Sequence, residues 1–188
     1  MLTAFIIFVV VAILLVIFGV KIYNKLVRLR NTVDESFAQI SVQLQRRYDL
    51  IPNLLEVVKG YAAHESETLR AVTLARTAAQ TAVQTESTSD AIAAEKAFDN
   101  ARMAINVVQE AYPDLKASAN FQQLQEELAT TENKMAFARQ NYNESVLEYN
   151  TATQVFPSNV IASFGKFTEK DMFKVENEAV NKAPKISF

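Results

Sequence analysis

The chain has 188 residues, of which 49% are hydrophobic, and its formal net charge is −2. It contains no Cys, no Trp, one His, three Gly and four Pro. This composition excludes disulfides, thiolate metal sites and a Cys/His nucleophilic couple. A single His also excludes a His-based zinc site, so we expect no bound metal and no cofactor. The near-neutral charge gives no electrostatic reason to bind nucleic acid, whose affinity depends on Lys and Arg neutralising phosphates.

The scarcity of Gly and Pro indicates few tight turns, which disfavours a sheet fold. Ala, Glu, Gln, Leu and Val are frequent instead, and these residues suit long helices or their apolar faces. The sequence therefore predicts an all-α fold.

Residues 1–20 carry no charged side chain, and Thr3 is the only polar one. A helix of ~20 apolar residues is long enough to cross ~30 Å of hydrocarbon. A secretory signal peptide would need a basic start, a shorter apolar core and a small-x-small cleavage site, none of which is present. We therefore expect residues 1–20 to be a transmembrane signal anchor that stays in the mature protein.

Positive charge follows this segment at Lys21, Lys25, Arg28 and Arg30, with no acidic residue before Asp34. Because positive flanks of a span tend to remain in the cytoplasm, we expect the amino terminus outside and the helical body on the cytoplasmic side of the membrane. Tyr23 would then lie at headgroup depth. We interpret the four cations mainly as a topology signal, with a specific site for anionic lipid as the alternative.

The first helix is predicted to continue from the anchor to about Gly60. Its apolar residues recur about every 3.6 positions, which marks one face of a straight helix. Pro52 lies inside this pattern and removes one helical hydrogen bond, but the register is kept on both sides, which favours a kinked helix over a broken one. The apolar face comprises Leu26, Leu29, Val33, Phe37, Ile40, Leu44, Tyr48, Ile51, Leu55, Val58 and Ala62.

Three further helices are predicted: an Ala-rich pair capped by Ser66 and Asp90, and a long last helix with apolar residues from Phe121 to Phe156. Small side chains let helix axes approach closely, so the pair should pack together or against another subunit. Residues 21–155 should then form an elongated up-down-up-down four-helix bundle with long first and last helices. The mixed apolar face of the last helix favours a core within one chain over an intermolecular coiled coil.

Residues 156–188 form an apolar tail whose side chains need to be covered. They can pack on the first helix, contact the lipid interface or bury themselves on a neighbouring subunit. The tail residues that we consider candidate oligomer contacts are Val160, Ile161, Phe164, Phe167 and Phe173.

Patterns of catalytic or metal-binding residues are absent from the sequence. His64 has Tyr61 three residues before it and Thr68 four residues after it, so neither di-metal nor zinc-protease spacing is met. The densest polar segment runs from Arg46 to Glu65. It is interpreted either as a supported helix kink or as a surface read by a partner, and its candidate residues are Arg46, Arg47, Asp49, Pro52, Asn53 and His64.

The segment RRYDLIPNLLEVVKGYAAHE (46–65), together with YNESVLEYN (142–150), FPSNVIASFGKF (156–167) and APKISF (183–188), resembles the LemA family of bacterial membrane proteins. The resemblance implies a bacterial envelope protein with one amino-terminal span and a helical-bundle domain, without an established enzymatic activity. It also implies kinship with a magnetosome protein linked to membrane remodelling, and genes often near those of membrane metalloproteases.

The sequence therefore predicts a protein that is not an enzyme and that acts through its surfaces. We expect a scaffold that lies in the lipid bilayer, forms a homo-oligomer and organises or remodels the membrane. The alternative is an adaptor that binds a membrane protein, such as a protease, through the Arg46–Glu65 segment.

Overall fold

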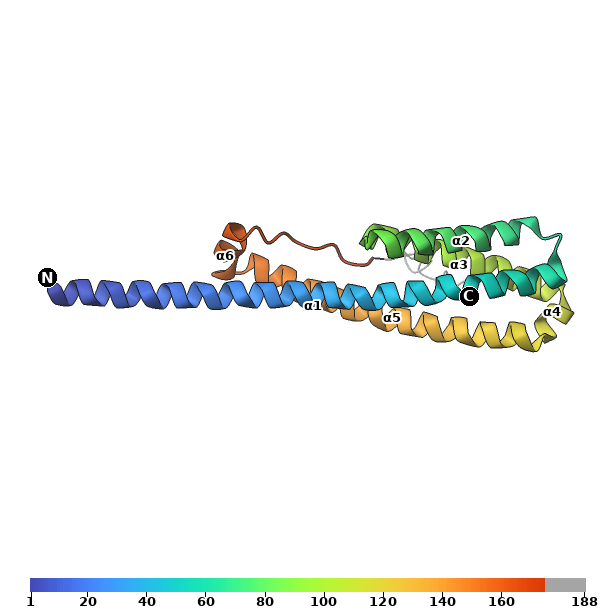
Figure 1. Cartoon of the computed structure of the whole chain (residues 1–188), viewed down its shortest axis with the longest axis horizontal. Helices are drawn as coiled ribbons and strands as arrows, with labels where there is room; N and C mark the ends of the chain where they lie inside the picture. The colour runs from blue at the N-terminus through green and yellow to red at the C-terminus, as the bar shows by residue number, and fades with distance from the viewer. Residues whose placement is uncertain (175–188) are drawn as a thin grey trace, which may run out of the picture. The chain divides into compact units, whose positions relative to one another are not determined.

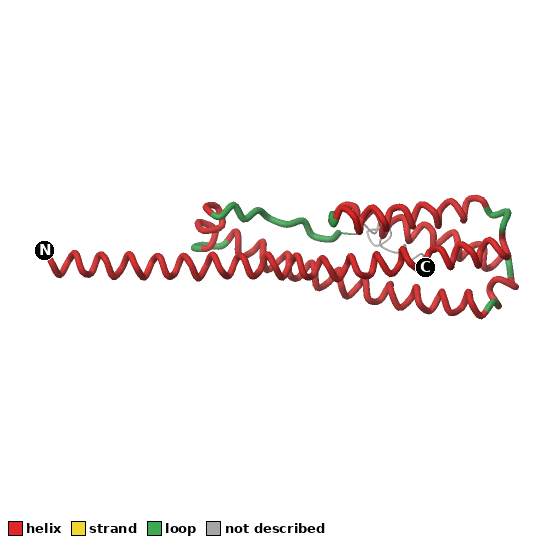
Figure 2. The backbone as a smooth tube through the Cα atoms, viewed as in Figure 1, coloured by secondary structure: helices red, strands yellow, loops and turns green. Residues whose placement is uncertain are grey.

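The computed structural model describes residues 1–174 and contains six helices (Figure 1). Figure 2 shows helices and loops in the described chain, without a strand. The predicted all-α fold is therefore confirmed, whereas the part of the predicted tail beyond Lys174 lies outside the described residues. The helices are α1 (Leu2–Ala62), α2 (Ser66–Thr85), α3 (Thr88–Ala111), α4 (Pro113–Ala117), α5 (Ala119–Gln154) and α6 (Ser158–Phe164).

Helix α1 is continuous through Pro52 and ends at Ala62, as the unbroken periodicity predicts. Its first part is apolar and long enough to cross a membrane, and none of the residues in that apolar window is buried. A helix that is apolar on every side has no polar face to turn to water. The segment is therefore suited to a membrane anchor by both length and composition.

The helix starts differ from two of the predicted caps. Ser66 is the first residue of α2, after Glu65 at the N-cap, and no side chain caps this end. Helix α3 begins at Thr88 after Ser87, so Asp90 lies in its first turn instead of capping it. Asp90 accepts a hydrogen bond from the Thr85 hydroxyl (2.6 Å), which ties the end of α2 to the start of α3. An acidic residue also suits the positive end of the helix dipole.

The chain divides into two compact units, and α1 and α5 contribute to both. Unit 2 contains residues 41–134 and a second stretch of the chain that starts at Phe173. Its core takes residues from α1, α2, α3, α4 and α5, including Ile51, Val72, Ile105, Leu115 and Phe121. The Ala-rich helices α2 and α3 pack against each other, as one of the two alternatives left open by the sequence predicts.

Unit 1 contains residues 1–40 and 135–172. Its buried side chains come mainly from α1 and α5, and the predicted face of α5 is buried through Tyr149. The prediction fails at Phe156, which is 81% exposed because α5 ends at Gln154 and the chain turns before Pro157. The apolar residues buried in this unit include Leu26, Val33, Ile40, Met135, Ala138, Tyr142, Val146 and Tyr149.

Candidate functional site

The Arg46–Glu65 segment, which lies in α1 as far as Ala62, has one face in the core of unit 2 and one in solvent. Leu50, Ile51, Leu54 and Val58 belong to the core cluster. A helix places residues three and four apart on the same side, so these spacings produce one continuous apolar face. Much of the distinctive sequence in this segment is therefore explained by packing.

Arg47 lies on the buried face, and its guanidinium forms an ion pair with Glu95 of α3. The two side chains are only 3% and 5% exposed. The guanidinium carbon also lies 4.1 Å from the centre of the Phe98 ring, a distance at which a cation is attracted to the aromatic face. Arg47 is therefore a structural group and not a surface that a partner can contact.

The other candidate residues of the segment are placed differently. Arg46, Asp49, Asn53 and His64 are exposed, and Pro52 is half-buried. Asp49 accepts a hydrogen bond from the Gln45 amide (2.9 Å). The kink interpretation would have the Asn53 side-chain amide bond backbone groups that Pro52 leaves free. The structure gives no hydrogen bond from this amide to the described part of the chain.

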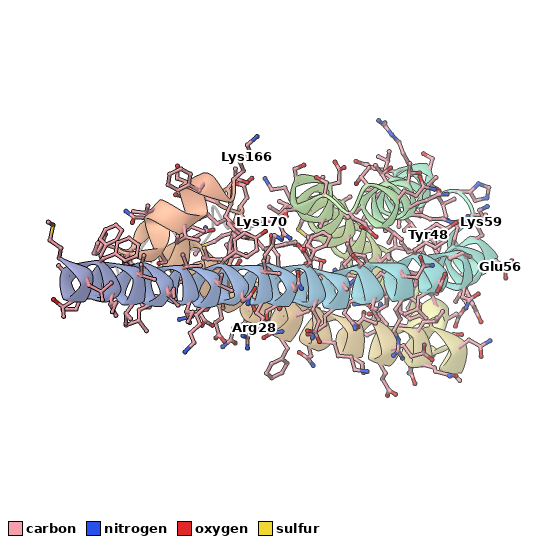
Figure 3. All side chains as sticks on the ribbon, turned by 60° about the vertical axis from the view of Figure 1, so that its left-hand side comes forward. Arg28, Tyr48, Glu56, Lys59, Lys166 and Lys170 are labelled. Atoms are coloured by element: carbon pink, nitrogen blue, oxygen red, sulfur yellow. The ribbon has the colours of Figure 1, made fainter. Side chains whose placement is uncertain are left out.

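Two tyrosines form contacts between separate segments of unit 2. Arg76 of α2 lies over the Tyr48 ring, 5.1 Å from its centre, and Figure 3 shows Tyr48 on α1. The Tyr112 hydroxyl donates a hydrogen bond to Glu65 Oε1 (3.0 Å). This bond is the main reason that the pKa of Tyr112 is raised above its ordinary value, because the carboxylate favours the protonated phenol.

Unit 1 contains a second set of polar contacts, which bind the non-helical segment 165–172, here called the strap. Asn150 of α5 donates to the Lys170 carbonyl and accepts from the Lys170 amide, both at 2.9 Å. The Tyr149 hydroxyl donates to the Thr168 carbonyl, and the Tyr142 hydroxyl donates to the Asp171 carbonyl, also at 2.9 Å. One helix therefore satisfies four backbone groups of a segment that lacks regular hydrogen bonding of its own.

The strap also contacts the basic neck that follows the apolar part of α1. The rings of Tyr23 and Phe167 meet edge to face with centroids 5.4 Å apart, and Arg30 lies 5.5 Å from the centre of the Phe167 ring. A Cβ at Gly165 would lie 2.5 Å from Phe167 Cε2, so this position needs a residue without a side chain. Lys170 Nζ lies 3.2 Å from Asp34 Oδ1.

The predicted membrane-interface residues are exposed: Lys21, Tyr23, Lys25, Arg28 and Arg30 all present side chains at the surface. Two of them, Tyr23 and Arg30, also contact Phe167 of the strap. Figure 3 shows Lys166 pointing away from the ribbon, which adds a cation beyond α6 that the sequence analysis did not include.

The five tail residues considered as oligomer contacts separate into two groups. Phe167 and Phe173 are buried within this chain, so they are not available to a second copy in this conformation. Ile161 is half-buried, whereas Val160 and Phe164 are exposed. Of these five candidates, only Val160 and Phe164, both on α6, are therefore exposed.

A groove is found in the described part of each unit. In unit 2, a groove of about 280 Å³ lies between α3 and α5, with Leu54, Phe98, Ile105 and Leu128 among its lining residues. In unit 1, a groove of about 420 Å³ is lined by α1 residues including Phe18, Ile22 and Lys25, and by the α5–α6 turn. Residues 1–174 contain no group of three His, Asp or Glu side chains placed to bind a metal.

Sequence reasoning missed Glu95 and Asn150 as structural groups, and it placed Tyr142 and Tyr149 on the apolar face of the last helix without predicting their hydrogen bonds to the strap. For Glu95 a signal existed, because it lies four residues after Ala91 and three before Phe98, on the predicted core face of its helix. Arg47 likewise lies three residues after Leu44 and four before Ile51, on the apolar face of its helix. Two opposite charges on facing apolar stripes indicate a buried pair, although not which helices supply it.

These features define an all-α protein with an amino-terminal apolar helix suited to membrane anchoring. The chain belongs to the LemA family, whose model matches residues 36–188, as the sequence resemblance predicted. Protein LemA of Metamycoplasma hominis is 28% identical over 139 residues, which cover 74% of this chain and 63% of that protein. The match thus spans less than two thirds of this relative's length.

We expect the variant Glu95→Gln to destabilise unit 2, because it leaves the Arg47 guanidinium buried without its carboxylate. Removing one partner of a buried pair lowers the free energy of unfolding by about 3–5 kcal/mol. The control is Glu132→Gln, which breaks the half-exposed Arg102–Glu132 pair and should cost about 0–1 kcal/mol. Urea unfolding of the full chain in detergent, followed by circular dichroism, measures both; equal effects would contradict the structural role.

The variant Asn150→Ala should release the middle of the strap, since it removes both hydrogen bonds to the Lys170 backbone. We expect the amide of Lys170 to lose most of its protection in hydrogen exchange, while amides within α5 keep theirs. The matched control is Asn133→Ala, an exposed position on the same helix. Protection of Lys170 that persists in Asn150→Ala would show that the side chain does not position the strap.

The strap contact of Tyr149 should weaken at alkaline pH. Burial raises the pKa of the Tyr149 phenol above its ordinary value, with Lys170 and Arg30 opposing this shift and Asp34 adding to it. Because the pKa is higher in the folded chain, the contribution is complete below about pH 10 and is lost as the pH rises through the folded value. Above about pH 10, the free energy of unfolding should decline less steeply with pH in Tyr149→Phe than in the parent protein. The control Tyr61→Phe measures the effect of removing an exposed phenol.

Proposed function

We propose that this protein is a membrane-anchored helical scaffold that assembles with copies of itself and organises or remodels the bilayer. The apolar part of α1 supports this proposal most directly, because a helix exposed and apolar on every side needs lipid around it. The exposed cations Lys21, Lys25 and Arg28 follow this segment. They support an orientation in the bacterial cytoplasmic membrane with the amino terminus outside and the helical body in the cytoplasm.

The proposed scaffold needs no catalytic group, cofactor or nucleic acid. It works through the arrangement of helices, for which we propose an up-down four-helix bundle in the part that carries α2 and α3. Copies held in one bilayer by parallel anchors meet repeatedly in the same orientation, so a modest contact surface is sufficient for assembly. A closed arrangement of identical contacts would produce a ring or cage.

A contact surface for assembly is offered by α3. Met103 and Val107 are 59% and 72% exposed, and their spacing of four places them on one side of the helix. Large exposed apolar side chains that share a face are typical of protein contact sites. This surface replaces the buried tail residues Phe167 and Phe173 as the candidate for contact between copies.

Negative charges placed on this surface should reduce assembly. We expect the full-length protein in mild detergent to elute as an oligomer, and the double variant Met103→Glu with Val107→Glu to elute mainly as a monomer. The control is Gln80→Glu with Gln84→Glu, which adds the same charges at the same spacing on α2 and should leave the oligomer intact. Light scattering coupled to size exclusion measures the mass, and a monomeric parent protein would contradict the scaffold proposal.

The second candidate function is an adaptor for a membrane protein such as a protease. It is supported by the polar surface of α1 that Arg46, Asp49 and Asn53 present to solvent next to a buried Arg47. This function predicts that Arg46→Ala with Asp49→Ala loses the partner protein without changing the mass of the assembly. A scaffold whose contacts lie on α3 predicts the reverse sensitivity.

A further inference from the structure

Helix α6 lies beside the apolar part of α1 (Figure 1). A Cβ built on Gly19 would be 3.7 Å from Ile161 Cδ1, an ordinary van der Waals distance. Gly19 belongs to the uncharged segment 1–20, one residue before its end. The short helix therefore packs at the level where the proposed anchor leaves the membrane.

The sequence around α6 is itself free of charge. No Asp, Glu, Lys or Arg occurs between Glu148 and Lys166, a stretch that includes the end of α5, the turn and all of α6. The uncharged segment 1–20 is bounded in the same way by Lys21. Contact between Gly19 and Ile161 thus brings together two uncharged stretches, each of which ends in a lysine.

The outer surface of this region is apolar. Phe164 is 84% exposed and Phe156 is 81% exposed, with Val155 and Val160 also at the surface. Ile161, by contrast, turns inward to α1, so the helix has an inner and an outer apolar side. Water is a poor environment for several large apolar side chains gathered in one place.

A groove joins this surface to the anchor. Its walls are apolar residues of α1, such as Phe18, Ile22 and Leu26, and the turn residues Val155 and Phe156. Lys25 lies on its edge, and Lys166 follows the helix at an exposed position. Glu148 is the one carboxylate among the lining residues. Mainly apolar walls with Lys25 and Lys166 nearby match a phospholipid, whose chains are apolar and whose headgroup carries a phosphate.

We propose that α6 and the turn before it insert into the same bilayer as the apolar part of α1, at the boundary between headgroups and acyl chains. The occupant of the exposed surface is phospholipid, and the protein then holds the membrane by two adjoining elements, one spanning and one interfacial. This inference rests on the proposed membrane anchoring of α1. One experiment tests both proposals, and its outcomes distinguish a failure of the anchor from a failure of the α6 proposal.

The chain has no Trp, so single substitutions supply a fluorescent probe. Three exposed phenylalanines are matched for this purpose: Phe8 in the apolar part of α1, Phe164 in α6, and Phe137 on α5, which is 75% exposed. Phe8→Trp, Phe164→Trp and Phe137→Trp are each made in the full chain and reconstituted in vesicles of phosphatidylcholine and phosphatidylglycerol. Brominated acyl chains are then introduced as a quencher of nearby tryptophan.

The proposal predicts that Phe164→Trp emits at shorter wavelength than Phe137→Trp and loses emission in brominated vesicles, most strongly when bromine is near the headgroups. Phe8→Trp should be quenched best by deeper bromine. Should Phe164→Trp misfold, as judged by its circular dichroism, Val160→Trp carries the same test.

Each other outcome is decisive. Quenching of Phe8→Trp but not of Phe164→Trp overturns the role of α6 and leaves the anchor in place. A short emission wavelength for Phe164→Trp without quenching means that a second copy covers α6, which also overturns the proposal. Absence of quenching at both positions overturns the anchor and the inference together.

Discussion

The structure depends on the continuity of α1. A helix advances its side chains by a fixed rotation, so an apolar face begun near Leu26 reaches Val58 in the same phase only if the helix is not interrupted. Pro52 tests this constraint, since its ring removes one hydrogen bond, yet the helix continues to Ala62. One uninterrupted backbone thus presents an apolar surface on every side at its start and a single apolar stripe thereafter.

The apolar faces of the helices could be predicted because side chains packed on one side of a helix recur in the sequence with the period of the helix. The buried faces of α1 and α5 agree with the sequence over most of their length, including Val33 and Met135. The starts of α2 and α3 were less predictable, since neighbouring Ser, Thr and Asp residues can each supply a cap. At the end of α5 the pattern continued to Phe156 although the helix did not, because periodicity alone does not register a chain turn ahead of Pro157.

The contacts of the strap were not predictable for a different reason. Tyr149 and Asn150 bind backbone atoms, and every residue except proline offers the same amide and carbonyl. The bound segment therefore carries no pattern that identifies its partner. The ion pair of Arg47 and Glu95 differs in this respect, because it joins two specific charged side chains that are 48 positions apart in the sequence.

Because the strap is bound largely through its backbone, some of its residues can be substituted more freely than others. Thr168 and Asp171 are bound through their carbonyl oxygens and their side chains are exposed, so their chemical nature can change while the strap stays in place. Gly165 and Phe167, which pack against Tyr23, have no such freedom. A surface next to the basic neck can therefore acquire a new charge pattern, and with it new binding properties, at little cost to the fold.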